Sequence, residues 1–266
     1  MRSYKFGIIA SCLPGVAEID ALEKIRQAGF ETVFTGENDP KTVYNFKERC
    51  EQLGLSVDSL HAPFRGINSF WIPGLAYRDL RNGIYSSIDA ASGADIPVIV
   101  CHVSSGWFPP QLCDIGFQRF DELVDYAISK NVKVAFENLR KVGNLAAIME
   151  RYEKIPEVGF CYDFGHEHGY TATVHFLELF GDRVFCTHIH DNHGRSQEDY
   201  YGEPDEHLMP FDGNLDYADA MKRLCQTNYT GALTLEIGQK GEYLEKSHKE
   251  FLQIAYERLR RISALI

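Results

Sequence analysis

The sequence predicts an α/β fold, a (β/α)₈ TIM barrel that forms a single domain over residues 1–266. Two observations support this prediction. Short apolar, strand-like segments alternate with longer amphipathic segments along the whole chain, a pattern typical of parallel strands covered by helices. Eight such pairs fit into 266 residues, which is close to the roughly 250 residues of a closed eight-stranded barrel. No linker rich in Pro, Ser or Gly divides the chain.

The candidate strands are the short apolar segments at residues 5–10, 31–34, 55–60, 97–101, 133–136, 158–162, 184–190 and 232–236. Helical patterns lie between them, and the clearest cover residues 19–25 (ended by Gly29), 77–91, 120–128 and 244–265. The loops after the third and seventh strands, at 61–76 and 191–213, are the longest. Long loops in a compact barrel are usually functional.

Composition sets limits on partners and location. Apolar residues make up 44% of the chain and charged residues 24%, as in ordinary globular proteins. The net charge of −11 gives no overall basic field, which argues against nucleic acid as a partner, although a local basic groove stays open. No apolar stretch approaches the ~20 residues of a membrane span, and no signal sequence is evident. We therefore expect a cytoplasmic protein with no membrane partner. The seven unpatterned cysteines favour reduced thiols.

In a barrel of this class the active site forms at the carboxyl ends of the strands. Six of the eight predicted strands end in an ionisable side chain able to bind a metal: His61, His102, Glu137, Asp163, His188 and Glu236. Any one of these alone is more often a hydrogen-bonding group. Six of them at one barrel mouth are costly to desolvate unless cations balance the carboxylates, so the set predicts a metal site.

The donor set narrows the choice of metal. Carboxylate oxygens and imidazole nitrogens without thiolate suit Mn²⁺, Mg²⁺, Co²⁺ or Zn²⁺ rather than copper(I) or an iron–sulfur cluster. No nucleotide cofactor is predicted. Cys101 and Cys161 lie beside the predicted ligands, but we expect strand alternation to point both away from the site, as small core residues.

The stretch HIHDNHG (188–194) contains three of the chain's histidines. On an extended strand, His188 and His190 share one face. Only one of them need be a metal ligand, and the other then supports a carboxylate or contacts the substrate. His193 falls on the following loop, where an exposed polar role and a functional one are equally compatible with the pattern.

Seven short motifs at strand ends and in the last long loop are similar to one known family. They are HAPF (61–64), CHVS (101–104), ENL (137–139), CYDFGH (161–166), HIHDNHG (188–194), DEHLMPFDGNLDY (205–217) and LEIG (235–238). In this order they resemble the xylose-isomerase-like TIM barrels, which include sugar phosphate isomerases and epimerases and the apurinic endonucleases of the endonuclease IV type. The similarity runs through nearly the whole chain.

The resemblance implies a set of metal ligands. The shared metal of that family is held by the equivalents of Glu137, Asp163, His188 and Glu236, with a register that puts His190 on the metal as the alternative. Further metal ligands of the endonuclease branch match His61, His102, His166, Asp205 and His207. Metal identity and number (one ion, or two or three) therefore stay open.

The function implied by the resemblance is metal-dependent isomerisation or epimerisation of a small sugar, ketose or related polyol or keto acid, within carbohydrate metabolism. Glu137 and Glu236 are then the catalytic acid and base, acting through an enediolate from opposite faces of the substrate. His166, Arg195, His190 and Trp107 are the expected substrate-binding residues. The predicted mouth loops are poor in basic residues and rich in aromatic ones, which suits a closed pocket for a small molecule; the aromatic residues are Phe64, Phe70, Trp71, Trp107, Phe108, Tyr200 and Tyr201.

Two other functions remain compatible with the sequence. One is a multinuclear zinc hydrolase that cleaves a phosphodiester or phosphomonoester, as the complete set of nine ligand positions suggests. The other is a barrel that binds a sugar without turnover, as a subunit of a larger assembly. Substrate identity and oligomeric state are left open, with a homo-oligomer through the outer helices as one alternative.

Overall fold

The computed structural model describes residues 4–171 and 173–265, and its strands form one parallel sheet in the order β7-β6-β5-β4-β3-β2-β1-β8. They are β1 (Lys5–Ile9), β2 (Thr32–Thr35), β3 (Ser56–His61), β4 (Val98–Cys101), β5 (Lys133–Glu137), β6 (Val158–Asp163), β7 (Val184–His188) and β8 (Ala232–Leu235). The sheet ends meet where Ile189 N–H donates to Thr234 O and Glu236 N–H donates to Ile189 O, both at 2.9 Å. The sheet thus closes into a nearly complete barrel, which confirms the predicted (β/α)₈ class.

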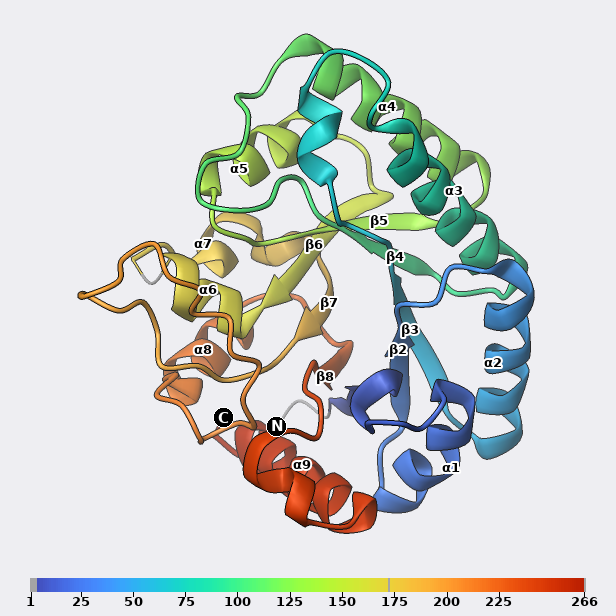
Figure 1. Ribbon diagram of the computed structural model, residues 1–266, viewed down its shortest axis with the longest axis vertical. Coiled ribbons are helices and arrows are strands. Elements are labelled where there is room, and N and C mark those ends of the chain that lie inside the picture. The colour runs from blue at the N-terminus through green and yellow to red at the C-terminus, as the bar shows by residue number, and fades with distance from the viewer. Residues whose placement is uncertain (1–3, 172, 266) are drawn as a thin grey trace.

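Helices surround the strands on the outside (Figure 1). They are α1 (Glu18–Ala28), α2 (Pro40–Leu53), α3 (Arg78–Gly93), α4 (Asp114–Ser129), α5 (Val142–Arg151), α6 (Phe164–Thr171), α7 (Phe176–Phe180), α8 (Tyr217–Leu224) and α9 (His248–Ser263). Short 3₁₀ turns lie between some of these elements: η1 (Ala10–Cys12), η2 (Ile67–Trp71), η3 (Gly181–Arg183) and η4 (Gly241–Glu245). Strand and helix alternate as expected for parallel pairing.

Most predicted boundaries agree with the structure within two residues. Helix α1 ends before Gly29, whose φ of 110° is a left-handed conformation that favours glycine. The last helix was predicted from residue 244 and this start is wrong. Helix α9 begins at His248 because Ser247 caps it: the Ser247 hydroxyl accepts from Glu250 N–H, and the Glu250 carboxylate accepts from Ser247 N–H.

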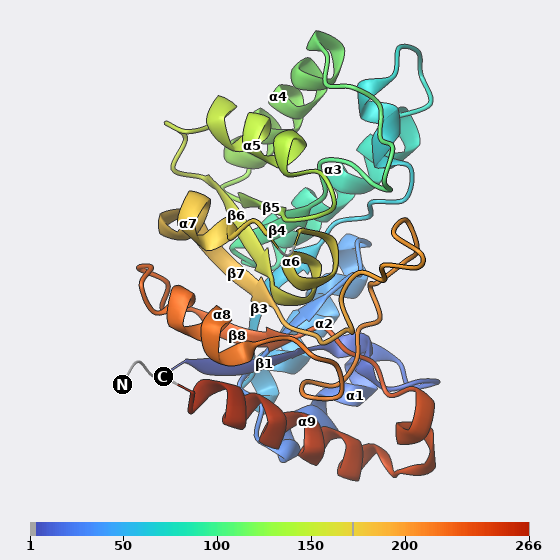
Figure 2. The same cartoon turned by 90° about the vertical axis from the view of Figure 1, so that its left-hand side faces the viewer.

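The long segments after β3 and β7 lie on the same side of the barrel, where the carboxyl ends of the strands are (Figure 2). The segment that joins β7 to α8, residues 189–216, is called the β7–α8 loop below. It folds back on itself through one antiparallel bridge between Asp191, just beyond β7, and Leu208. Of the helices in the described ranges, none combines the length and the apolarity that crossing a lipid bilayer requires.

All seven cysteines are free, as predicted. Cys101 packs in the main core between strands and helices, also as predicted. The prediction that Cys161 points away from the site is wrong. Its Sγ lies within 4.8 Å of donor atoms of Glu137 and His188. Cys161 precedes Asp163 by two residues, so strand alternation places both side chains on the inner face of the barrel.

Candidate functional site

Four of the six predicted strand-end residues form one group at the carboxyl end of the barrel. This central cluster consists of Glu137, Asp163, His188 and Glu236, each from a different strand end, with one donor atom of each within 4.8 Å of the others. His188 Nδ1 lies 2.8 Å from Glu137 Oε1 and 3.3 Å from Glu236 Oε2. Parallel strands carry these side chains to a common edge because their residues before the loops are in register, with Asp163 opposite His188.

The two remaining strand-end residues, His61 and His102, face the same glutamate. His102 Nε2 lies 2.8 Å and His61 Nε2 3.4 Å from Glu137 Oε2. His61 Nδ1 lies 2.8 Å from Ala62 O and donates to it, which leaves the lone pair of Nε2 directed at the carboxylate in the neutral ring. A lone pair and a carboxylate oxygen repel each other unless a proton or a cation lies between them. Glu137 therefore belongs to two groups of ligands at once.

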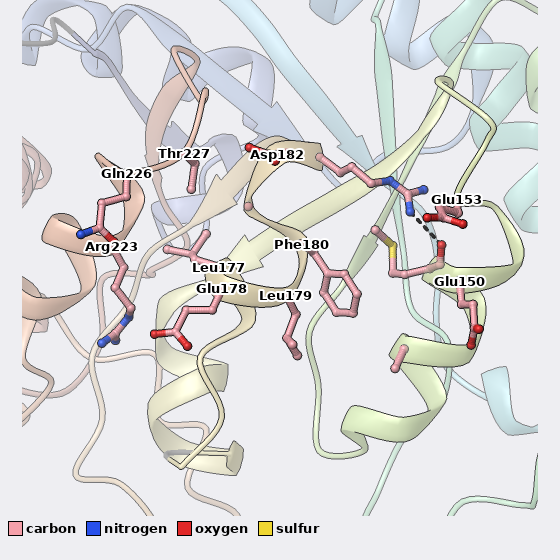
Figure 3. Close-up of a pocket in the computed structure, with 14 residues that line it drawn as sticks. Glu150, Glu153, Leu177, Glu178, Leu179, Phe180, Asp182, Arg223, Gln226 and Thr227 are labelled. Carbon is pink, nitrogen blue, oxygen red and sulfur yellow. Dashed lines mark hydrogen bonds between the residues drawn. The ribbon is translucent and has the colours of Figure 1, made fainter.

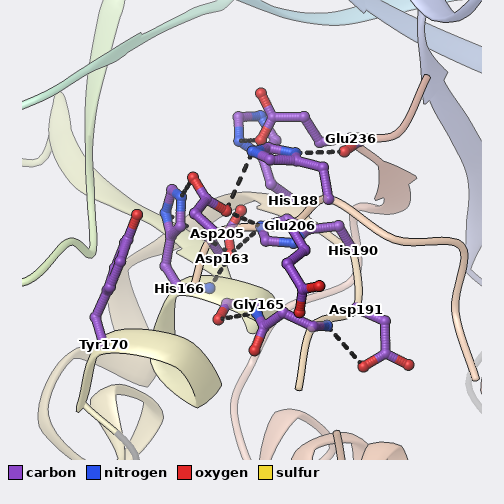
Figure 4. A network of polar contacts seen from close by, with 12 residues as sticks. Asp163, Gly165, His166, Tyr170, His188, His190, Asp191, Asp205, Glu206 and Glu236 are labelled. Carbon is purple, nitrogen blue, oxygen red and sulfur yellow. Dashed lines mark hydrogen bonds and ion pairs between the residues drawn. The ribbon is translucent and has the colours of Figure 1, made fainter. Parts of the chain in front are cut away.

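A third group, the loop cluster, consists of His166, His190, Asp205 and His207. Asp205 Oδ1 lies 3.4 Å from His190 Nε2 and 3.2 Å from His207 Nε2, and Asp205 Oδ2 lies 3.3 Å from His166 Nε2. Figure 4 shows His166, His190 and Asp205 gathered beside Asp163. His188 and His190 thus face different clusters, and each of them lies among candidate ligands.

Several buried polar atoms in these clusters have no hydrogen-bond partner among the described residues. They are Asp163 Oδ2, His166 Nδ1, His188 Nε2, both ring nitrogens of His190, and Asp205 Oδ1. Buried polar atoms are normally paired, so a set of unpaired oxygens and nitrogens that face one another fits a divalent cation. The residues present are therefore suited to hold metal.

The charges in the site are consistent with that fit. Burial alone would raise the pKa of the Glu137 carboxyl, but the charge of His188 and the hydrogen bonds from His102 and His188 hold this pKa well below its ordinary value. At Glu236 burial again acts to raise the carboxyl pKa, but the charge of His188 outweighs it and lowers this pKa to about 2. Burial would lower the pKa of His188, yet the carboxylates of Glu236 and Glu137 raise it well above its ordinary value. The protein without metal thus keeps positive charge on His188 between the two carboxylates, where a bound cation would replace it.

Two buried side chains that sequence reasoning did not single out hold the ligands in place. Asn138 joins two strand ends, donating to Asp163 O and accepting from Asp163 N–H, both at 2.8 Å. The Asp191 carboxylate accepts backbone N–H groups at 2.8 Å from Phe211 and at 3.2 Å from Leu215, across the β7–α8 loop. Each follows a predicted ligand by one to three positions in the motifs ENL and HIHDNHG, and this proximity was the available signal.

The neighbouring Asn192 is completely buried and ties the same loop to α6. Its Nδ2 donates to Gly165 O, and its Oδ1 accepts from Gly194 N–H, both at 2.8 Å. His193 follows on the surface and pairs with Glu206, its Nδ1 2.9 Å from Glu206 Oε2. The stretch HIHDNHG therefore contains two candidate ligands, two loop anchors and one exposed histidine.

The predicted substrate-binding residues take different places. His166 lines the cavity above the clusters. His190 lies beneath it in the loop cluster. The Arg195 guanidinium is stacked between two rings, 4.1 Å from the centroid of Trp107 and 4.3 Å from that of Tyr200, and donates to Tyr170 O. Neither Arg195 nor Trp107 lines the cavity; both join the β7–α8 loop to the rest of the barrel mouth.

The predicted mouth aromatics divide into two sets. Phe70 and Trp71 are buried in the main core, where the Trp71 indole donates to Val103 O at 2.8 Å, so these two pack against the barrel and do not line the cavity. Both fall on η2, which packs inward against α4. Phe64 lines the cavity, and its ring stacks on His102 at 4.2 Å between centroids.

The cavity above the clusters has a volume of about 240 Å³ and is lined by His61, Phe64, His102, Ser105, Glu137, Leu139, Arg140, His166, Tyr170, Glu203, Asp205, His207 and Glu236. A larger hollow of about 710 Å³ lies on the outside of the barrel around α7 and η3, between Glu150 and Arg223 (Figure 3). No residue of the three clusters lines that hollow. We therefore place the candidate active site at the smaller cavity, where the ligands and the orphaned polar atoms are.

Comparisons with known proteins agree with the geometry. Residues 22–255 match the family model of the xylose isomerase-like TIM barrels. The protein y4fM of Sinorhizobium fredii is 32% identical over 187 residues, a match that covers 63% of this chain and 57% of that protein. The chain thus spans little more than half the length of this relative.

Two sugar epimerases are among the solved structures that share this fold. D-allulose 3-epimerase from Methylomonas sp., in complex with D-allulose, superposes with a TM-score of 0.74 at 16% identity, covering 100% of this chain and 98% of that one. The 3-keto-D-glucoside 4-epimerase YcjR from E. coli superposes with a TM-score of 0.71 at 17% identity, covering 98% of this chain and 100% of that one. At these identities the likeness establishes the common fold.

Proposed function

The chain belongs to the xylose isomerase-like TIM barrel family, and from this premise we propose that it is a divalent-metal-dependent isomerase or epimerase of a small sugar, ketose or related polyol or keto acid. One observation carries the proposal. Glu137 and Glu236, both of which line the cavity, approach the same nitrogen of His188, at 2.8 and 3.3 Å. Two carboxylates that lie close to one ligand group and line the same cavity suit the removal of a proton from a bound substrate and its return elsewhere.

The central cluster would hold the cation, through Glu137, Asp163, His188 and Glu236. When bound, the cation supplies electrostatic stabilisation for the negative charge that develops on substrate oxygens. Glu137 and Glu236 are ionised, because both carboxyl pKa values lie below their ordinary values, and can each accept a proton. One carboxylate takes the proton next to the substrate carbonyl, and the other, once it has taken up a proton from solvent, returns that proton to the product.

The shape of the cavity agrees with a small substrate. Its volume of about 240 Å³ is below the roughly 300 Å³ at which pockets for drug-sized ligands begin. Phe64, Leu139 and Tyr170 give it apolar surface beside the carboxylates and imidazoles that also line it. Water is thereby limited near the two glutamates, which strengthens every charge interaction there.

Exchange of hydrogen with solvent tests the proposal. We expect Mn²⁺-loaded protein in D₂O to introduce deuterium at the carbon next to the carbonyl of at least one sugar in a panel of ketoses, inososes and keto acids, followed by mass spectrometry. Glu236→Gln should reduce this exchange by about 10³-fold, because the amide cannot accept the proton. Glu242→Gln, at an exposed position of η4, is the matched control. Absence of deuterium from every member of the panel would contradict the proposal.

A second candidate function is favoured by the contact between the clusters. Glu137 is shared by the central cluster and the His61/His102 pair, and Asp163 Oδ1 lies 3.2 Å from His190 Nε2 of the loop cluster. Such adjacent donor sets suit a hydrolase with two or three zinc ions that cleaves a phosphate ester. Elemental analysis of protein purified without chelator separates the two: near one ion per chain favours the isomerase, and near three zinc ions with hydrolysis of bis(p-nitrophenyl) phosphate favours the hydrolase.

A further inference from the structure

Arg140 is the only lysine or arginine among the described residues that line the cavity. It lies just beyond β5, three positions after Glu137. Its guanidinium carbon lies 4.0 Å from the ring centroid of Tyr170 and 5.5 Å from that of Trp107. Its Nε is buried and has no hydrogen-bond partner in the described structure. Stacking on Tyr170 thus fixes the planar cation in a cavity whose other charged groups are carboxylates and histidines.

The partner of Arg140 comes from a different part of the molecule. Glu203, on the β7–α8 loop, pairs with the Arg140 guanidinium through Oε2 and accepts a hydrogen bond from the Tyr170 hydroxyl through Oε1 at 2.6 Å. The Glu203 side chain is 59% exposed, whereas that of Arg140 is 11% exposed. The exposed Glu203 carboxylate therefore occupies a binding site formed by two donors, the Arg140 guanidinium and the Tyr170 hydroxyl, which lie beyond β5 and on α6.

We propose that Arg140 and Tyr170 form a binding site for an anionic group of the substrate, a carboxylate or a phosphate, and that Glu203 occupies this site in the ligand-free protein. The inference rests on the proposed function and specifies its substrate class as acidic sugars. A guanidinium and a hydroxyl recognise both kinds of oxyanion in the same way. An ion pair with so exposed a carboxylate is worth little, so a substrate anion can replace Glu203 at small cost.

The position of the Arg140/Tyr170 site relative to the central cluster and the loop cluster sets the orientation of the substrate. The Tyr170 ring stacks on His166 of the loop cluster at 5.2 Å between centroids, and Glu203 precedes Asp205 by two residues. An anionic group bound by Arg140 would lie near the loop cluster, while the reacting carbon lies near Glu137 and Glu236. Arg140 is the one lysine or arginine among the described residues that line the cavity, so it also favours one orientation of an anionic substrate.

Calorimetric titration of Mg²⁺-loaded protein tests the inference without requiring turnover. The probes are D-fructose (neutral), 2-keto-D-gluconate (carboxylate) and D-fructose 6-phosphate (phosphate). We expect at least one anionic probe to bind about tenfold or more tightly than fructose, as one charge-assisted contact implies. Preference for the keto acid identifies a carboxylate substrate, and preference for the ester a phosphate substrate.

Variants separate an anion site from a simple loop contact. Arg140→Met should abolish the preference, and Arg140→Lys should keep only part of it, because lysine lacks the planar fork. Glu203→Gln should tighten binding of the anionic probe several-fold, since the competing charge is removed and the side chain keeps its size. Arg65→Met, at an exposed position that does not line the cavity, is the matched control and should leave the preference unchanged.

Two results would overturn the inference. One is that no anionic probe binds more tightly than fructose in either the natural protein or Glu203→Gln. The other is that Arg140→Met, with unchanged metal content, retains the preference. Failure of the proposed function looks different: the anion preference and its loss in Arg140→Met are then present, but no sugar of the panel takes up deuterium.

Discussion

The central cluster and the loop cluster differ in what carries their ligands. The four ligands of the central cluster stand at the ends of hydrogen-bonded strands, and Glu137, Asp163 and His188 are almost completely buried. Three of the four ligands of the loop cluster, His190, Asp205 and His207, come from the β7–α8 loop, and the side chains of Asp205 and His207 are 20% and 31% exposed. His207 also adopts a left-handed φ of 44°, which is unusual for a residue with a side chain.

The difference between the two clusters shows which part of the site is preformed. The barrel fixes the central cluster through the same hydrogen bonds that hold its strands together, so the cluster persists as long as the fold does. The loop cluster exists only while the β7–α8 loop keeps its place against Asp191, Asn192 and α6. We therefore expect changes in the barrel to abolish catalysis, and changes in the loop to remove only the loop cluster and the contact of Glu203 with the cavity.

The largest effect is expected at Glu137, which two groups of ligands share. Glu137→Gln should lower metal content and reduce solvent exchange by about 10³-fold or more, because the amide replaces both a ligand and an acid–base group. Partly exposed Glu157, just before β6 and outside the three clusters, offers Glu157→Gln as the control with unchanged activity. Metal analysis and deuterium uptake measure the outcome, and near-normal exchange in Glu137→Gln would show that the central cluster is not the catalytic one.

A smaller, mainly structural effect is expected at Asp191. Asp191→Ala leaves several buried backbone N–H groups without an acceptor and should lower the free energy of unfolding by about 3 kcal/mol, measured by urea denaturation. The loop cluster should lose its metal while the central cluster keeps its own. Asp199→Ala, at an exposed position in the same loop, is the control. Equal loss of metal from both clusters would contradict the distinction drawn between them.

A more selective change is available at Gly165 in α6. A Cβ there would lie 2.1 Å from His190 Cε1, so Gly165→Ala must displace the His190 ring. We expect metal affinity of the loop cluster to fall about tenfold and overall stability to fall by about 1–3 kcal/mol. Gly143→Ala in α5, where nothing lies within 4 Å of the new Cβ, should have no such effect. Calorimetric metal titration of the two variants compares them directly.

The smallest effect is the dependence of stability on pH. Nearby carboxylates raise the pKa of His166 and His188 well above its ordinary value and that of His207 to about 9, against the effect of burial. Histidines with raised pKa stabilise the metal-free fold below their unfolded value near 6.5, and this stability is lost as pH rises towards 9. Metal competes with those protons, so loaded protein should gain stability over the same range. The midpoint of thermal unfolding, measured from pH 6 to 9 with and without Mn²⁺, gives the stability of both forms. If the midpoints of the two forms change with pH in parallel, metal and protons do not compete for these histidines.

Much of the barrel and of the central cluster could be predicted from the sequence. Strands appear as apolar runs, and the residue that ends each run must lie at the common edge of a parallel barrel. This reasoning gives Glu137, Asp163, His188 and Glu236 together with His61 and His102, and the resemblance to the family selects the first four as the shared metal ligands. The prediction for Cys161 is wrong, although the same alternation rule, applied from Asp163, places the Cys161 side chain on the inner face of the barrel. The sequence therefore contains the information that places Cys161.

Other features were decided only by the tertiary structure. The sequence puts His188 and His190 on one face of the strand, but it does not determine which of them reaches the central cluster. The two residues are about 7 Å apart along the strand, so that His188 lies in the central cluster and His190 lies beside Asp205 in the loop cluster. The pairing of Arg140 with Glu203 joins residues 63 positions apart. Periodicity and motifs describe local geometry, whereas such contacts depend on how the β7–α8 loop folds back across the barrel mouth, which is set by non-local hydrogen bonds and packing.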